Sequence, residues 1–214
     1  MRKECLKYIF TVEGETEEWY FKWLQNAINS SDAIYKVKFD CKPRKDPVKL
    51  VKGLSIPTEI THVIDRESED PYHVRCFEDA LDRMSEAQKL KRNVKYKLGY
   101  SNFTFELWMI LHKQNCNGCL TDRRQYLRQL NNAYNETFRN LDEYKRESNF
   151  KKVLERLTLN DVKSAVQRSK EIEQRLVENG HTLHKHKGYT YYRENPSLSI
   201  GKIIGDILKE CRLS

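Results

Sequence analysis

The feature that most constrains the fold is a regular exchange between strand-like and helix-like patterns over the first half of the chain. Strands are predicted at 5–12, 35–41, 60–65 and 94–100, from apolar runs and from alternation of apolar and polar residues. Helices are predicted between them, at 15–28, 47–54 and 75–92. Strands that alternate with helices favour a small, mostly parallel sheet with helices on both faces. We therefore expect an α/β fold.

Beyond residue 103 the pattern becomes mainly helical. Helices are predicted at 103–113, at 122–136, from a cap at Asn160 to a stop at Gly180, and near 200–211. The stretch 180–196 is predicted to be a long loop with a short strand at 189–192. We divide the chain into an α/β core at 1–114 and a helical extension at 115–214, which packs on the core as one compact unit.

The net charge of +8 favours an anionic partner, of which nucleic acid is the first candidate. No segment approaches the ~20 apolar residues of a membrane span, and the N-terminus lacks a secretory apolar stretch. We expect a cytoplasmic protein without a membrane partner. The candidates for nucleic-acid contact are Lys42, Arg44, Lys45, Lys185, Lys187 and Arg193. The last three lie among tyrosines, which suits phosphate contact and base stacking, and the ordinary alternative is a solvated loop with core tyrosines.

Carboxylates stand where two predicted strands end. Glu13 follows the first apolar run and precedes Gly14, while Asp65 ends the third strand with Glu67 two residues on. Open α/β sheets bind ligands at the carboxyl ends of their strands, and Mg²⁺ prefers oxygen ligands. The sequence therefore predicts a Mg²⁺ site formed by Glu13, Asp65 and Glu67, in which Mn²⁺ can substitute. The acids at 15, 17 and 18 are explained by the helix dipole instead.

Glu106 is a further candidate because apolar residues surround it on nearly every side of the segment SNFTFELWMILH. A buried carboxylate is costly unless it is paired or binds a metal. Two interpretations stay open, an additional site acid or a Glu106 paired with lysine or arginine. His112 ends the same run, and its ordinary interpretation is a core histidine with both ring nitrogens satisfied.

Several motifs together resemble one family of bacterial proteins. VEGETEEWYF, VIDRE, SNFTFELWMILH, the pair Tyr144-Lys145, the AVQRSKEIE helix and the late ENPS are similar to the RloB/AbiLii abortive-infection family. The resemblance runs in order along nearly the whole chain. It implies a Toprim-like domain, with Glu13 and the pair Asp65 and Glu67 as Mg²⁺ ligands and Glu106 as an additional acid.

The resemblance has two departures. The Toprim pair is usually Asp-x-Asp, whereas the second acid here is Glu67 with its longer side chain. Proline and cysteine often follow the Ser-Asn of the family block, whereas this chain has Phe103 and Thr104. Lys145 matches the family's Tyr-Lys, and a lysine near the site could stabilise phosphorane charge. A surface lysine is the alternative.

The function expected from these features is Mg²⁺-dependent nuclease activity in antiphage abortive infection, on DNA or RNA, with transfer RNA as a suggested substrate. The resemblance implies an ABC/SMC-like ATPase encoded alongside as partner, and a homodimer is an allowed assembly. One alternative is a non-catalytic module that binds nucleic acid or the partner. Another is a different Mg²⁺ enzyme, such as a nucleotidyl transferase or a small phosphatase.

Overall fold

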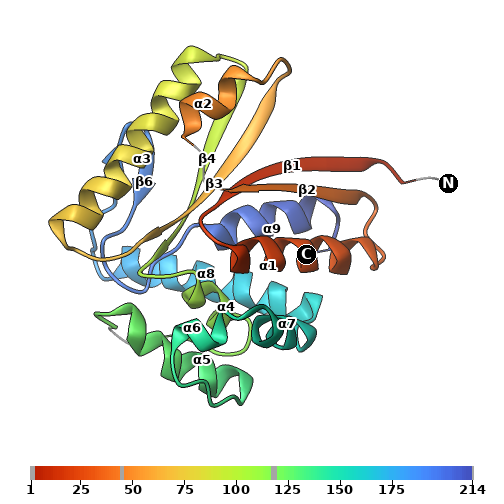
Figure 1. Ribbon diagram of the computed structural model, residues 1–214, viewed down its shortest axis with the longest axis vertical. Helices are drawn as coiled ribbons and strands as arrows, with labels where there is room; N and C mark the ends of the chain where they lie inside the picture. The colour runs from red at the N-terminus through yellow and green to blue at the C-terminus, as the bar shows by residue number, and fades with distance from the viewer. Residues whose placement is uncertain (1–2, 44–45, 117–119, 214) are drawn as a thin grey trace.

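The computed structural model describes residues 3–43, 46–116 and 120–213, in which a parallel sheet is followed by a mainly helical region (Figure 1). The strands of the sheet are β1 (Cys5–Val12), β2 (Lys36–Pro43), β3 (Thr58–Arg66) and β4 (Val94–Asn102). The helices between them are α1 (Glu15–Asn29), α2 (Pro47–Lys52) and α3 (Pro71–Leu90). The prediction of an α/β fold with helices on both faces is confirmed.

The four strands are parallel and lie in the order β2-β1-β3-β4. The chain moves from β1 outward to β2, crosses back to β3 on the other side of β1, and continues outward to β4. β1 and β3 pair only at residues 9–11 and 60–62, so the amino half of β1 and the carboxyl end of β3 extend beyond the pairing. The direction of the connections reverses between β1 and β3.

Two apolar clusters cover the two faces of the sheet. On one face, Phe10 of β1 stacks on Phe21 of α1 with ring centroids 4.1 Å apart, and this cluster continues into the helical region. On the other face, Ile60 and Ile64 of β3 pack with residues of α2 and α3. Successive strand residues point to opposite faces, so both clusters draw on β3.

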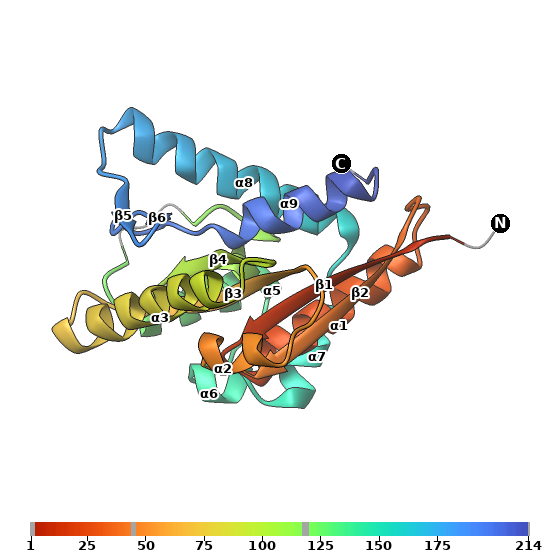
Figure 2. The same cartoon turned by 90° about the horizontal axis from the view of Figure 1, so that it is seen from above.

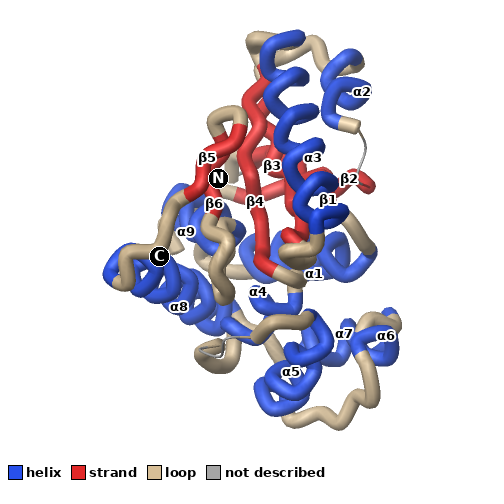
Figure 3. The backbone as a smooth tube through the Cα atoms, turned by 90° about the vertical axis from the view of Figure 1, so that its left-hand side faces the viewer, coloured by secondary structure: helices blue, strands red, loops and turns tan. Residues whose placement is uncertain are grey.

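The second half of the chain adds helices and one hairpin. The helices are α4 (Glu106–Leu111), the 3₁₀ turn η1 (Arg123–Gln125), α5 (Tyr126–Tyr134), α6 (Leu141–Tyr144), α7 (Glu147–Glu155), α8 (Leu159–Glu178) and α9 (Ile200–Glu210). The hairpin is β5 (His184–His186) with β6 (Tyr189–Tyr191). Helices α4 to α7 lie beyond the ends of β3 and β4 in two views (Figures 1 and 3). They therefore face the carboxyl edge of the sheet.

Helix α9 lies between α8 and the sheet (Figure 2). The two helices approach closely because α9 carries glycine where they cross. A Cβ added at Gly201 would lie 2.6 Å from the Cβ of Ser169 on α8, which is inside any normal contact distance. Thr61 of β3 and Gly99 of β4 lie on the same face of the sheet. The crossing of the two helices holds the helical region against this face.

Several predicted boundaries are wrong in ways that have local causes. The helix predicted from 103 begins at Glu106, because Phe103 has a φ of +64° and Thr104 continues the turn. The cap of α8 is Thr158 rather than Asn160, and Thr158 forms a capping box with Asp161. The helix predicted at 122–136 is divided between η1 and α5. Helices α6 and α7 were not predicted.

His112, just after α4, is the expected core histidine with both ring nitrogens satisfied. It is 1% exposed, its Nδ1 lies 2.9 Å from the Trp108 carbonyl, and the Tyr20 hydroxyl lies 3.1 Å from Nε2. A carbonyl requires a donor, so Nδ1 carries the proton and Nε2 accepts from Tyr20. Burial lowers the pKa of His112 to about 4.

The buried histidine predicts a loss of stability in acid. Between pH 6.5 and about pH 4 the unfolded chain binds a proton at His112 that the folded protein excludes. The free energy of unfolding should therefore fall as the pH falls through this window, by about 3 kcal/mol at its full extent. Urea unfolding at a series of pH values should show a shallower fall for His112→Gln. The exposed-site control, His181→Gln, should follow the parent, and equal pH profiles for parent and His112→Gln would contradict the assignment.

Candidate metal and phosphodiester site

The carboxyl ends of β1 and β3 bring the first two predicted acids together. Glu13 directly follows β1, and Asp65 is the second-last residue of β3. The Oε2 of Glu13 accepts a hydrogen bond of 3.1 Å from the backbone N–H of Asp65. Ligands of open α/β sheets bind where the strand connections reverse. In this sheet that position is the carboxyl edge between β1 and β3.

A cavity of about 340 Å³ opens at this edge of the sheet. Its lining comes from the turn between β1 and α1, the end of β3, the segment after β4, η1, and the residue after α6. The lining residues are Glu13, Gly14, Glu15, Thr16, Glu17, Asp65, Glu67, Thr104, Arg123 and Lys145. Four of the five predicted site residues therefore line one cavity, and Glu106 is bonded to one of them.

Glu106 forms an ion pair with Lys145. One of the two interpretations of Glu106 was that it pairs with a lysine or an arginine, and Lys145 is that residue. Its carboxylate is 1% exposed, and its Oε1 lies 3.2 Å from the ammonium of Lys145. The hydroxyl of Thr104 donates to the other carboxylate oxygen. Burial lowers the pKa of Lys145, but Glu106, Asp65 and Glu17 together raise it by more. Lys145 is therefore a charged residue that connects the buried acid to the cavity.

Glu17 is an acid of the cavity that sequence reasoning assigned to the helix dipole. It is 5% exposed, and its pKa is raised by burial, with Glu106 adding to the effect. The hydroxyl of Thr16 donates to its Oε2 over 3.0 Å. A signal was present in the sequence, because the apolar stripe of α1 lies three, four and seven residues after Glu17, at Tyr20, Phe21 and Leu24. An acid in line with an apolar stripe faces the interior.

Gly14 leaves room for the side chain of Glu17. A Cβ at residue 14 would lie 3.1 Å from the Glu17 Oε2, which is tighter than an ordinary contact. The glycine therefore lets the turn between β1 and α1 pass close to this carboxylate.

The cavity has a marked excess of negative charge. Burial raises the pKa of Asp65 well above its ordinary value, and Glu13, Glu17 and Glu106 raise it further. Lys145 opposes them only in part. Carboxylates that repel one another in a buried place are stabilised by a cation. The charge distribution therefore fits a bound divalent cation.

The donor set fits Mg²⁺ in a particular way. Among residues 3–43, 46–116 and 120–213, no three His, Cys, Asp or Glu side chains are grouped so that they could enclose a metal by themselves. Mg²⁺ usually takes one or two protein carboxylates and completes its shell with water and substrate phosphate. Glu13 and Asp65 are the two carboxylates that fit this role.

Glu67 lies at the outer rim of the cavity. Its side chain is 44% exposed, and its Oε2 lies 3.5 Å from His73 Nε2 and 4.0 Å from Arg123 Nη1. Two basic side chains thus already face this carboxylate. Its role as a metal ligand stays a prediction with less support than that of Asp65.

The predicted nucleic-acid contacts are spread over several elements. Lys42 lies near the carboxyl end of β2 and pairs with Asp40 at 3.4 Å, while Arg44 and Lys45 lie outside the described residues. Lys185 is exposed on β5, and Lys187 in the hairpin turn lies 3.8 Å from Asp82. Arg193 is exposed on the loop after β6. Binding of nucleic acid by these residues stays a prediction.

The tyrosines of this region are buried, which corrects the expectation that they stack on bases. Tyr189, Tyr191 and Tyr192 are 3–8% exposed. Tyr191 packs edge-on against Phe77 of α3 with ring centroids 5.0 Å apart. The hairpin therefore uses its aromatic rings for the core, as the ordinary alternative stated.

Asn102, the last residue of β4, holds the loop that follows the hairpin. Its Nδ2 lies 3.3, 3.1 and 2.6 Å from the carbonyl oxygens of residues 192, 193 and 194. Its backbone N–H donates to the carbonyl of Ser197 over 2.9 Å. The Ser-Asn of one motif thus positions the ENPS of another, although the two are far apart in sequence.

Comparison with known proteins identifies one family. A model of the family described as RloB-like protein matches residues 8–207. Neither the curated proteins nor the solved structures gave a match. Within the described part of the chain, no helix has the length and apolar character needed to span a membrane. The match includes every residue of the acidic cavity, and the chain belongs to the RloB-like family.

Proposed function

We propose that this protein is a Mg²⁺-dependent nuclease that acts in antiphage defence. The observation that carries the proposal is the acidic cavity at the reversal point of the sheet, which is lined by Glu13, Glu17, Asp65 and Lys145 and has the buried Glu106 behind the lysine. A negative cavity in a chain of net charge +8 suits a cation that is shared with a polyanionic substrate.

Each residue has a defined task in this proposal. Glu13 and Asp65 hold Mg²⁺, which supplies charge stabilisation for displacement at a phosphodiester. Glu13 takes the proton of the attacking water as general base. Lys145 acts as a point cation beside the developing phosphorane charge, and Glu106 and Thr104 hold it in position.

The biological setting is a proposal that the family assignment supports. Membership in the RloB-like family favours a defence role. The Toprim-like nature of the fold, an ATPase partner and a homodimeric assembly are part of the same proposal. The parallel sheet with acids at the ends of its first and third strands agrees with a Toprim-like domain.

A second candidate is a non-catalytic module that binds nucleic acid or a partner. One observation favours it: basic side chains already face Glu67, the third predicted ligand. In this case the acids would bind no catalytic metal, and the basic surface alone would carry the function.

A nuclease assay tests the proposal. Purified protein is incubated with DNA, total RNA and transfer RNA in Mg²⁺ or Mn²⁺, with and without the ATPase encoded alongside. We expect cleavage by the parent and its loss in Glu13→Gln, which keeps the acceptor for the Asp65 N–H but removes the charge. Equal cleavage by both proteins would overturn the site assignment. Binding without cleavage under every condition would favour the non-catalytic module.

A further inference from the structure

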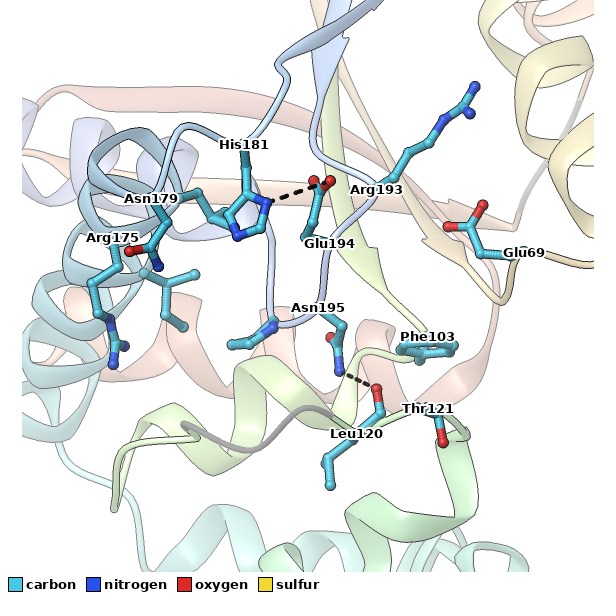
Figure 4. A pocket seen from close by; sticks show the side chains of 13 residues that line it. Glu69, Phe103, Leu120, Thr121, Arg175, Asn179, His181, Arg193, Glu194 and Asn195 are labelled. Carbon is cyan, nitrogen blue, oxygen red and sulfur yellow. Dashed lines mark hydrogen bonds and ion pairs between the residues drawn. The ribbon is translucent and has the colours of Figure 1, made fainter.

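A second cavity, of about 540 Å³, lies beside the acidic one. It is enclosed by the end of α8, the loop after β6, and the segments that follow β3 and β4 (Figure 4). Its volume is within the range of pockets that bind small molecules or single groups of larger ligands. The function proposed above uses no residue of this cavity.

The two cavities share a wall. Phe103 lines the second cavity and the next residue, Thr104, lines the acidic one. Likewise, Glu69 lines the second cavity and Glu67 lines the acidic one. Thr121 lines the second cavity and Arg123 lines the acidic one. Three separate segments therefore have one residue on each side. A chain-like ligand bound over the acids would need to extend only across this wall to place its next unit in the second cavity.

The lining is mainly apolar and includes one aromatic ring. Phe103, Leu120, Ile172, Leu176 and Pro196 supply the apolar surface. Phe103 has a φ of +64°, a conformation that is rare for a bulky residue and that proline cannot adopt. Its N–H donates to the Arg66 carbonyl over 2.8 Å, which helps to hold the turn. An aromatic residue is thus kept in an unfavourable backbone conformation at the wall between the cavities.

Among the described residues that line the cavity, Arg193 is a cation without an ion pair. Glu69 pairs with Arg66 at 2.6 Å, and Glu194 lies 3.6 Å from His181 (Figure 4). The guanidinium of Arg193 has no ion pair with any described residue. Its backbone is fixed, because its carbonyl accepts from Asn102 and from Arg66. The side chain of Arg193 is exposed and extends outward from the cavity, so the rim offers an unpaired positive charge on a flexible side chain to an anionic ligand (Figure 4).

We propose that the second cavity binds one unpaired nucleotide of a single-stranded nucleic acid, with its base against Phe103 and a backbone phosphate near Arg193. The proposal rests on the function proposed above, since it places that substrate beside the acids. A flat base with a phosphate matches an apolar, aromatic lining with a cation at its rim. A paired base cannot enter a pocket of this size without leaving its stack, so a single strand is the form that fits.

Binding is measured without cleavage, by fluorescence anisotropy of a labelled oligonucleotide with the full-length protein in EDTA. We expect Phe103→Ala to weaken single-strand binding by roughly 5- to 100-fold, since stacking on one aromatic side chain has this size. Phe103→Tyr, which keeps the ring, should bind like the parent. A duplex of the same sequence should bind equally to the parent and to Phe103→Ala.

Arg193→Gln supplies a second test at an exposed position, where folding is not at risk. We expect weaker binding and a decrease of about 0.7 in the slope of log K against log salt, the value for one phosphate contact on a single strand. The matched control is Arg92→Gln, at an exposed position just before β4, which should keep the parent slope.

The outcomes separate this inference from the proposed function. Unchanged single-strand binding in both Phe103→Ala and Arg193→Gln overturns the nucleotide pocket, whether or not the protein cleaves. Equal loss of duplex and single-strand binding in Phe103→Ala overturns it as well. Cleavage by Glu13→Gln at the parent rate overturns the metal site and leaves the binding result standing.

Discussion

Replacing Asp65 by asparagine is expected to abolish Mg²⁺-dependent cleavage and, in EDTA, to make the protein more stable. Loss of a metal-holding carboxylate should reduce the rate by about 10³-fold, which corresponds to several kcal/mol of charge stabilisation. Stability should rise because burial and the acids Glu13, Glu17 and Glu106 all disfavour a charge at this position. Activity and stability would thus change in opposite directions at one residue.

Thermal unfolding checks the stability part of this prediction. Mg²⁺ at about 100 times its Kd should stabilise the parent by about 2.7 kcal/mol and should leave Asp65→Asn unchanged. The effect should grow as the pH rises, because the raised pKa of Asp65 means that protons compete with the metal at lower pH. In the absence of metal, the dependence of stability on pH has the opposite sign. The folded state then holds a proton that the unfolded chain has released, so stability falls as the pH rises through this pKa.

The control for Asp65→Asn is Asp79→Asn, the same change at an exposed position of α3. It should keep the parent activity and the parent response to Mg²⁺. An Asp65→Asn protein that is destabilised in EDTA, or that still gains stability from Mg²⁺, would show that Asp65 is not a strained carboxylate at a metal site.

Of the substitutions proposed for this protein, Lys145→Met is expected to lower the free energy of unfolding the most. The change leaves the carboxylate of Glu106 buried at 1% exposure, with only the hydroxyl of Thr104 as a hydrogen-bond partner among the described residues. Removing one member of a buried ion pair typically costs 3–5 kcal/mol. Lys145 is itself 36% exposed, so a value of about 3 kcal/mol is expected by urea unfolding.

A double-mutant cycle separates the pair from the single residue. Adding Glu106→Gln to Lys145→Met removes the uncompensated charge, so the double variant should recover most of the lost stability. It should remain inactive, because the cation beside the substrate is still absent. Lys152→Met, at an exposed position of α7, is the control and should be nearly neutral. A Lys145→Met protein as stable as this control would contradict the buried pair.

The convergence of Glu13 and Asp65 was predictable from the sequence, because parallel strands end at one edge of a sheet. The order β2-β1-β3-β4 was not, since alternation of strands and helices does not state on which side each strand is added. The reversal between β1 and β3, which opens the acidic cavity, therefore had to come from the structure.

The sequence also does not predict which side chains that are far apart in the chain come into contact. The sequence indicated that Glu106 is buried, and that Lys145 could lie near the site, but not that the two form a pair. Glu17 was not predicted as a site residue, because the helix dipole already explains an acid at this position. Its place in line with the apolar residues Tyr20 and Leu24 nevertheless indicated that it faces the interior. The turn at Phe103 depends on contacts with Arg66 and with the distant loop at 192–197, which no local pattern reveals.

The bonds of Asn102 to the loop at 192–194 have a consequence for synthesis on the ribosome. The residues of the acidic cavity have all been made once translation passes Lys145. The second cavity also needs Arg193, Glu194 and Pro196, which emerge about fifty residues later at ordinary rates of several residues per second. A nascent chain therefore holds its acids for a period of seconds without the rim that would position a substrate beside them.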